Sequence, residues 1–197
     1  MIKIGLTGSI GMGKSTVANM FERAGIPVFD ADAVVRKMQG PGGSLVSEIG
    51  ERFPGTVIGG LLDRERLAHA VLDDPDELAA LEEIIHPAVR KAREAFIAKN
   101  ANAPALVFDI PLLFETAGEG EFDRVIVVSA SPEVQRARVL ERTGMTVEKL
   151  EALLRRQMPD EEKRRRADFI VDTGSNLSTT EAQIGEIIAC LGLALSG

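Results

Sequence analysis

The first residues of the chain alternate between apolar and polar or small side chains and then become rich in glycine. Residues 2–6 alternate with the period of a strand, and a loop begins at Gly8. From 14 to 24 the apolar positions have helical spacing, and Gly25 stops that helix. A second short strand is expected at 26–29. The order strand, loop, helix, strand predicts the start of a parallel sheet.

The stretch 33–103 has no convincing strand pattern. Glycines and prolines at 40–43 and 54–60 divide it into helical pieces. Asp63 is a good helix N-cap, and a long helix is expected from 75 to 99. This part of the chain is therefore predicted to be a helical insertion.

Two unbroken apolar runs, at 105–109 and 125–128, indicate that the sheet resumes after the insertion. Such runs are typical of strands covered on both faces, as in parallel sheets. The stretch 133–166 is predicted to be helical and is heavily charged. A last short strand is expected at 169–171, and apolar positions through 184–191 indicate a closing amphipathic helix.

The composition is that of an ordinary globular protein and excludes several functions. The 197 residues are 45% apolar and 27% charged, with a net charge of −7 and neither Trp nor Tyr. An acidic chain without these stacking side chains is a poor nucleic-acid binder. No run approaches the ~18 apolar residues of a membrane span, and the N-terminus lacks the pattern of a signal peptide. We therefore expect a cytoplasmic protein, with the one cysteine, Cys190, packed in the core.

Residues 8–15 read GSIGMGKS and match the phosphate-binding pattern GxxxxGK[ST] in full. Glycines let the backbone turn tightly and point successive N–H groups at phosphate oxygens, and the helix that follows adds its positive end. The amine of Lys14 can reach the β- and γ-phosphates, and the Ser15 hydroxyl can bind Mg²⁺. The predicted nucleotide-binding residues are Gly8, Gly11, Met12, Gly13, Lys14, Ser15 and Thr16.

Other signals favour a kinase among the proteins that carry this loop. The NKxD segment of GTPases and the LSGGQ signature of transport ATPases do not occur. Arg136, Arg138 and Arg142 lie on one predicted helix, and more arginines follow at 155–156 and 164–166. Small-molecule kinases use such an arginine-rich lid to stabilise the charge of the transition state. Arg138 and Arg142 share a helix face, and we expect at least one arginine of the lid to contact ATP.

Further motifs, in this order and spacing, resemble the dephospho-CoA kinase family over about residues 2–192. They are Asp30-Ala31-Asp32, IIHPAVR at 84–90, DIPLLFE at 109–115, QMP at 157–159, Lys163, and ADFIVD at 167–172. The resemblance implies phosphorylation of the ribose 3′-hydroxyl of dephospho-CoA by ATP, which gives CoA and ADP. ATP and dephospho-CoA are then the expected partners, and ATP and Mg²⁺ the expected cofactors.

The resemblance also implies a chain of three parts. We expect a P-loop NTPase-type nucleotide core at about 1–32, 104–130 and 167–197. The helical insertion, at about 33–103, would bind the acceptor, and the arginine-rich lid would span about 131–166. All three would belong to one kinase chain that is a monomer or a weak homo-oligomer.

Asp32 is the predicted catalytic carboxylate. Lys14 and Arg138 are the other two predicted catalytic residues. Asp32 follows the second strand, where it can face the γ-phosphate and take the proton of the attacking hydroxyl. Asp30 is the alternative helix cap. Asp109 ends an apolar strand, a position suited to binding Mg²⁺ directly or through water, with capping of the loop as the alternative.

The remaining predicted site residues bind the nucleotide, the acceptor or the metal ion. Arg142 is expected at the nucleotide. The expected acceptor-binding residues are His86, Arg90, Asp109, Pro111, Leu112, Leu113 and Glu115, with Ser15 and Asp109 as metal ligands. A histidine such as His86 is, without the family resemblance, more often structural.

Three positions differ from the pattern common in the family. Leu153 stands where an arginine is usual, four residues before the glutamine of the QMP motif. Asp172-Thr173-Gly174-Ser175 replaces Asp-Asn-Ser-Gly, and Met12 replaces a small residue of the phosphate loop. The contacts to adenine and ribose are therefore left open.

Two other functions remain as alternatives. A kinase of another small acceptor, such as a nucleotide or a shikimate-like polyol, would share the loop, the lid and the length. A nucleotide-dependent regulator would bind ATP without transferring phosphate. The HPxVR and DxPLLFE motifs argue against the first, and Asp32 with the arginine-rich lid argues against the second.

Overall fold

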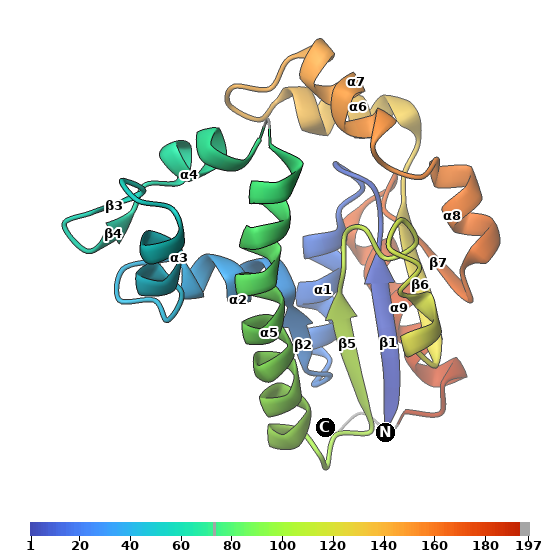
Figure 1. Ribbon diagram of the computed structural model, residues 1–197. Coiled ribbons are helices and arrows are strands. Elements are labelled where there is room, and N and C mark those ends of the chain that lie inside the picture. Colours follow the sequence, from blue (N-terminus) through green and yellow to red (C-terminus); the bar gives the residue numbers. More distant parts are fainter. Residues whose placement is uncertain (73, 194–197) are drawn as a thin grey trace. The chain divides into compact units, whose positions relative to one another are not determined.

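The computed structural model describes residues 1–72 and 74–193 (Figure 1). The chain forms two compact units. One consists of Met1–Phe29 together with the chain from Asn100 onward, and the other of Asp30–Lys99.

The larger unit is built on a five-stranded sheet in the order β2-β5-β1-β6-β7. Strand β1 pairs in parallel with β5 and with β6, and β6 pairs in parallel with β7. The predicted fold class, a parallel sheet flanked by helices, is therefore confirmed. The strands are β1 (Ile2–Thr7), β2 (Val28–Asp30), β5 (Ala105–Asp109), β6 (Arg124–Ser129) and β7 (Phe169–Asp172).

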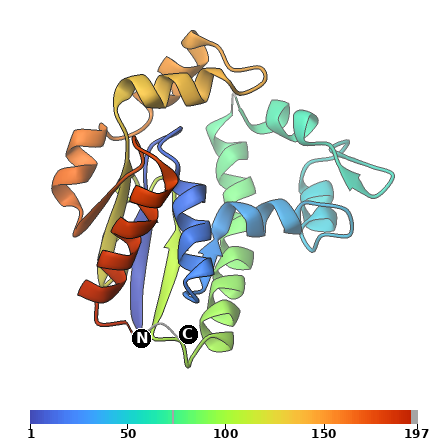
Figure 2. The ribbon, with the colours of Figure 1, turned by 180° about the vertical axis from the view of Figure 1, so that it is seen from behind.

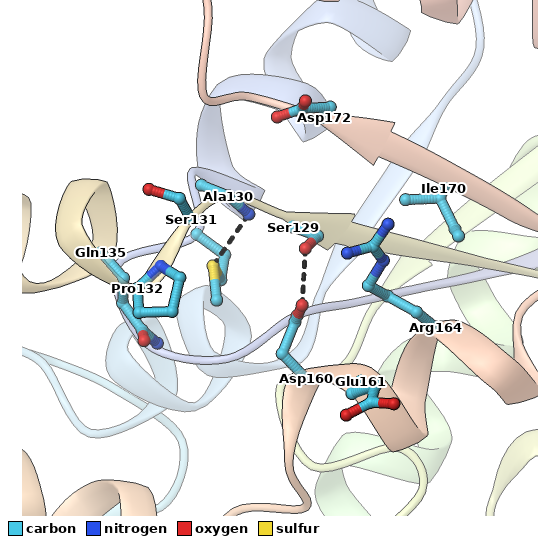
Figure 3. Close-up of a pocket in the computed structure, with 11 residues that line it drawn as sticks. Ser129, Ala130, Ser131, Pro132, Gln135, Asp160, Glu161, Arg164, Ile170 and Asp172 are labelled. Carbon is cyan, nitrogen blue, oxygen red and sulfur yellow. Dashed lines mark hydrogen bonds between the residues drawn. The ribbon is translucent and has the colours of Figure 1, made fainter.

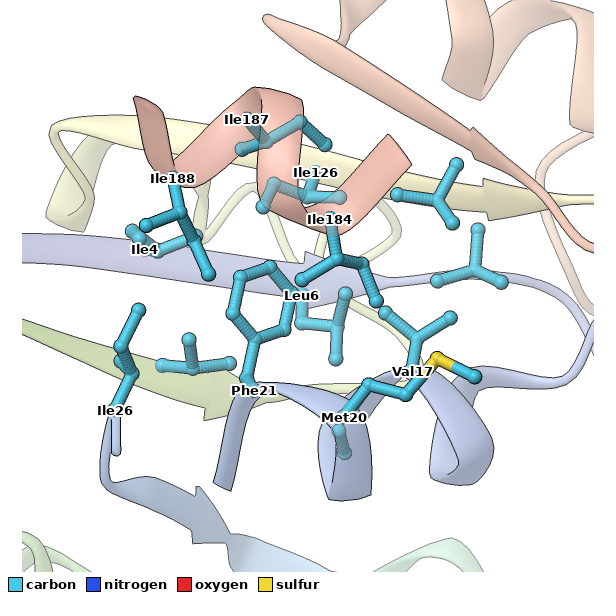
Figure 4. Packing of buried hydrophobic residues seen from close by; sticks show 14 of the residues in the cluster. Ile4, Leu6, Val17, Met20, Phe21, Ile26, Ile126, Ile184, Ile187 and Ile188 are labelled. Carbon is cyan, nitrogen blue, oxygen red and sulfur yellow. The ribbon is translucent and has the colours of Figure 1, made fainter. Parts of the chain in front are cut away.

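Helices α1 (Lys14–Arg23) and α9 (Leu177–Cys190) cover one face of this sheet (Figure 2). Phe21 of α1 and Ile184 of α9 pack over Leu6 of β1 in the main hydrophobic core (Figure 4). All five residues of β5 are buried, as the unbroken apolar run predicts. The sheet is thus the buried centre of this unit.

Cys190 is exposed, so the prediction that it packs in the core is wrong. The buried stripe of α9 runs through Ile184, Ile187 and Ile188. Cys190 stands two residues after Ile188, about 200° further around the helix. Cys190 therefore lies on the solvent side of α9, although the surrounding sequence is apolar.

The smaller unit has its own hydrophobic core. Leu45, Ile49, Phe53, Leu67 and Leu81 are buried there. Its elements are α2 (Ala31–Met38), α3 (Val46–Arg52), β3 (Val57–Ile58), β4 (Leu61–Leu62), α4 (Arg64–Val71) and α5 (Pro75–Lys99). The long helix expected from 75 to 99 is confirmed, and it continues through Pro87.

A short hairpin lies in the region where no strand was expected. β3 and β4 pair antiparallel, with Val57 opposite Leu62. Gly59 and Gly60 connect them with φ of 57° and 79°. Two positive φ values at the centre of a two-residue loop are what a tight hairpin needs, so the two glycines were the signal for this hairpin.

The charged stretch predicted as helical is divided into three helices. They are α6 (Pro132–Leu140), α7 (Val147–Arg155) and α8 (Asp160–Arg166). Gly144, with φ of 77°, lies in the connection before α7, and Pro159 precedes α8. Ser131 caps α6, as its position before Pro132 predicts.

Asp63 caps α4 by accepting hydrogen bonds from the amides of Glu65 and Arg66 at 3.1 and 3.0 Å. We expect Asp63→Ala to lower the free energy of unfolding by about 1 kcal/mol, because both amides lose their acceptor. Asp63→Asn keeps a side-chain oxygen that can accept these bonds, so it should lower the free energy of unfolding by only about a few tenths of a kcal/mol. Urea denaturation of the two variants measures the difference, and equal losses would contradict the capping role.

Candidate functional site

The phosphate loop connects β1 to α1 and lies very close to its neighbours. Gly11 has φ of 80°, and a Cβ placed on it would stand 2.5 Å from Cγ2 of Val139 in α6. A Cβ on Gly8 would stand 2.6 Å from the carbonyl oxygen of Val128 in β6. These two positions require glycine for reasons of space, and Gly11 also for its backbone conformation.

Met12, the unusual residue of this loop, is 2% exposed. Its side chain belongs to the main hydrophobic core, and its Sδ accepts a hydrogen bond from the Ala130 amide at 3.1 Å. The large side chain therefore points into the protein. The loop accommodates the Met12 side chain because the hydrophobic core encloses it.

Lys14 forms an ion pair with Asp109, which ends β5. The side chains are 16% and 4% exposed. Parallel neighbours β1 and β5 end at the same edge of the sheet, so Asp109 lies beside the helix start that carries Lys14. Two residues predicted for the site are thus in direct contact.

Glutamine side chains hold both the backbone amide and the backbone carbonyl of Ile10. Gln135 of α6 donates from Nε2 to the Ile10 carbonyl at 2.7 Å, and Gln157 accepts from the Ile10 amide at 3.1 Å. A carbonyl needs a donor and an amide needs an acceptor, so the orientation of each glutamine is fixed by its partner. Sequence reasoning missed both glutamines, although Gln157 belongs to the QMP motif.

Arg138 of α6 lies against the loop that follows β7. Its guanidinium donates from Nη1 to the Thr173 hydroxyl at 2.9 Å and from Nη2 to the Thr173 carbonyl at 2.6 Å. The same hydroxyl donates to the Met12 carbonyl at 2.7 Å. Arg138 is therefore connected to the phosphate loop through one threonine. Arg142, which follows α6, is exposed.

The segment after β5 presents some of its predicted acceptor-binding residues and buries another. Leu112 is 42% exposed, whereas Leu113 is 1% exposed and packs with Phe114 and Val125. The carbonyl of Pro111 accepts a hydrogen bond from the Thr7 hydroxyl at 3.3 Å. This contact ties the start of the segment to the end of β1.

Glu115 makes interactions within the protein. Its Oε1 accepts a hydrogen bond from the Met158 amide at 2.8 Å and lies 2.9 Å from Nζ of Lys163, whose side chain is 0% exposed. Burial would raise the pKa of the Glu115 carboxyl, but Lys163 and the Met158 amide hold it below the ordinary 4.5. The segment after β5 is thus joined to the segment before α8.

A pocket of about 670 Å³ opens between β6, β7, α6 and α8 (Figure 3). Ser129 donates a hydrogen bond from its hydroxyl to Asp160 there at 2.6 Å. The pocket meets the phosphate loop at Met12, and Lys14 and Ser15 do not line it. It therefore lies beside the predicted phosphate site and does not contain it.

Three predicted site residues, Asp32, His86 and Arg90, lie in the smaller unit together with the predicted cap Asp30. Asp30 caps α2, its side chain accepting from the Ala33 amide at 2.7 Å, as the alternative for this residue predicts. Asp32 is exposed in the first turn of the same helix. His86 and Arg90 are exposed on α5, four residues apart and hence on one face.

Ser15 and Asp109 are the predicted metal ligands. Within residues 1–72 and 74–193 no group of three or more His, Cys, Asp or Glu side chains could hold an ion. The donor chemistry of a hydroxyl and a carboxylate still fits Mg²⁺. This ion keeps several waters and commonly takes only one or two protein ligands beside phosphate oxygens.

The part of the chain that the structure describes has no helix that is both long enough and apolar enough to cross a bilayer. The longest helix, α5, carries charged residues along its length.

The parallel sheet and the glycine-rich loop before α1 define the class as a P-loop protein. The dephospho-CoA kinase from Campylobacter jejuni shares this fold with a TM-score of 0.65 at 24% identity, over 96% of each chain. TT1252 from Thermus thermophilus has a TM-score of 0.84 at 38% identity, over 100% of this chain and 98% of that one.

The sequence profile of dephospho-CoA kinase matches residues 2–179. A dephospho-CoA kinase from Rhodopseudomonas palustris strain HaA2 is 53% identical over 190 residues, which are 95% of this chain and 94% of the relative. One from Agrobacterium fabrum is 52% identical over 195 residues, 98% and 99% of the two chains. This chain belongs to the dephospho-CoA kinase family.

The two glutamines at Ile10 are expected to hold the phosphate loop in its binding conformation. Gln135→Leu and Gln157→Leu should each raise the KM for ATP about 10-fold, because one peptide group of the loop loses its partner. Gln39→Leu, in the smaller unit, is the matched control and should leave this KM unchanged. Initial-rate kinetics at varied ATP test the prediction, which fails if the three variants behave alike.

The lowered pKa of Glu115 predicts a pH-dependent contribution to stability. The ionised carboxylate stabilises the folded protein above pH 4.5, and the contribution is lost as the pH falls through the lower pKa of the folded state. At pH 7, Glu115→Gln should cost about 3 kcal/mol, because Lys163 is left buried without an opposite charge.

As the pH falls below 4.5, the difference between wild type and Glu115→Gln should shrink, since wild type then loses the same charge. The double variant Glu115→Gln, Lys163→Met should recover much of the loss at pH 7. Urea denaturation between pH 3 and 7 measures these differences. A difference that does not change with pH would show that the charge of Glu115 is not what stabilises the protein.

Proposed function

We propose that the chain transfers the terminal phosphoryl group of ATP to the ribose 3′-hydroxyl of dephospho-CoA, giving CoA and ADP. The single observation that carries this proposal is the relationship over nearly the whole chain to proteins named dephospho-CoA kinase, at 52–53% identity. The phosphate loop and its neighbours supply the physical basis for the chemistry.

The phosphate loop binds the triphosphate through its backbone amides and Lys14. Lys14 starts α1, where the helix adds a partial positive charge to the side chain's own. Its ion pair with Asp109 holds the amine at the edge of the sheet before ATP arrives. ATP then replaces or shares this partner, so the amine is positioned with little loss of side-chain freedom.

Asp32 orients the acceptor hydroxyl and takes its proton. It is exposed and lies in the first turn of α2, where the helix dipole favours the ionised carboxylate that this role needs. The proton leaves the ribose oxygen as the bond from that oxygen to phosphorus forms, and the bond to ADP breaks. Arg90 provides a positive charge, and His86 a ring N–H donor on the same face of α5, for a phosphate of the acceptor.

Mg²⁺, held by Ser15, Asp109 and phosphate oxygens, would neutralise charge on the transferring group. Arg138 and Arg142 belong to an arginine-rich lid over residues 131–166 that adds further positive charge at the transition state. We place the reaction in the cytoplasm, where ATP is available.

The first experiment measures ADP release from ATP and Mg²⁺, with and without dephospho-CoA, for wild type and Asp32→Asn. Wild type should release ADP only with dephospho-CoA. Asp32→Asn should lower turnover about 10²-fold or more and still bind ATP, because the amide cannot take a proton.

Two results would count against the proposal in different ways. If ADP release by wild type does not depend on dephospho-CoA, then dephospho-CoA is not the acceptor. Other hydroxyl acceptors such as shikimate would then be compared. Unchanged turnover of Asp32→Asn would leave the reaction in place but remove Asp32 from it. Asp76→Asn, at the start of α5, is a control that should behave as wild type.

A further inference from the structure

Thr173 occupies a fixed position next to the phosphate loop. It follows the last residue of β7, is 6% exposed, and its amide donates to the Ser129 carbonyl at 2.9 Å. A Cβ on Gly13 of the phosphate loop would stand 3.1 Å from the Thr173 hydroxyl oxygen. The backbone of Thr173 is therefore held by β6, and its side chain packs directly against the loop.

The Thr173 hydroxyl uses its donor and its acceptor on two different parts of the site. It donates to the Met12 carbonyl at 2.7 Å and accepts from Nη1 of Arg138 at 2.9 Å. The Thr173 carbonyl takes Nη2 of the same guanidinium at 2.6 Å. One residue thus holds two nitrogens of the planar arginine fork and one carbonyl of the phosphate loop.

We propose that Thr173 is a positioning residue, which holds the Arg138 guanidinium beside the phosphate loop so that it is already in place when ATP binds. The inference rests on the proposed function, in which Arg138 acts on the nucleotide. An arginine side chain has many rotamers, and fixing it in advance removes an entropy loss from the binding or transfer step. Arg138 is half-buried and fixed in this way, whereas Arg142 is exposed.

This role explains what a side chain at position 173 must supply. It needs one donor for the Met12 carbonyl and one acceptor for the guanidinium, within a space closed by Gly13. The hydroxyl of threonine or serine and the amide of asparagine all meet the chemical requirement. Valine has the shape of threonine and supplies neither group.

The test compares Thr173→Val with Thr173→Ser in the reaction with dephospho-CoA. Thr173→Val should lower kcat/KM for ATP about 10- to 100-fold, the effect of losing a buried hydrogen bond to a charged group. The KM for dephospho-CoA should stay within about 2-fold. Thr173→Ser keeps the hydroxyl and should stay within about 3-fold of wild type in kcat/KM.

A double-variant cycle separates positioning from general damage. Arg138→Met removes the group that Thr173 is proposed to position, so adding Thr173→Val to it should cost several-fold less than Thr173→Val costs in wild type, leaving only the loss from the unpaired Met12 carbonyl. Independent effects that multiply in the double variant would overturn the proposal. So would wild-type or higher activity of Thr173→Val, which would mean that Thr173 keeps Arg138 away from ATP.

Thr180→Val is the matched control for the loss of a buried hydroxyl. Thr180 is 1% exposed and donates to the carbonyls of Asp172 and Asn176 at 3.4 Å, without contact to Arg138. It should leave kcat/KM for ATP within about 2-fold. If Thr173→Val does not fold, Thr173→Ala removes the same hydroxyl without filling its space, and the same losses are expected of it.

ATP binding measured by calorimetry keeps this inference separate from the identity of the acceptor. If wild type shows no turnover with dephospho-CoA, the proposed function fails. The cycle between Thr173 and Arg138 can then still be read from ATP affinity, where the same non-additivity is expected. Additive losses of affinity in that measurement would contradict the positioning role on their own.

Discussion

The close approach of the phosphate loop to its neighbours is the constraint on which the rest of the larger unit depends. At Gly11 and Gly8 no space remains for a Cβ, because Val139 of α6 and the backbone of β6 already occupy it. The loop therefore cannot shift without moving α6 or the sheet. Since Val139 is fully buried, α6 is packed directly on the loop, and the arginine that it carries is placed with it.

A loop that is packed this tightly must also satisfy its backbone polar groups, and it does so with side chains from distant parts of the chain. Gln135 donates to the Ile10 carbonyl, Gln157 accepts from the Ile10 amide, and the Thr173 hydroxyl donates to the Met12 carbonyl. Unpaired groups at these positions would cost free energy and allow other loop conformations. The same contacts that satisfy the loop bring the segments after β6 and β7 to the phosphate loop.

The sequence predicted the parts of the site that depend on local pattern. The strands, α1 and the loop follow from periodicity and a specific motif, and the cap at Asp63 follows from residue type. The contacts of Gln157 and Thr173 join positions 147 and 161 residues apart, and no periodicity records them. Thr173 was noticed in the sequence only as a departure from the family pattern, and its hydrogen bonds supply the reason why a threonine serves there.

The charge of the chain and the charge of its site require different explanations. A net charge of −7 opposes the binding of polyanions at long range, so affinity for ATP must come from groups that act at short range. The loop amides, the helix start and Lys14 are such groups. Asp109 and Thr173 hold the cations Lys14 and Arg138 in place through neighbouring oxygen atoms. Under the proposed function, cations that neighbouring oxygen atoms already hold in place would let an acidic protein bind an anionic nucleotide at this one site.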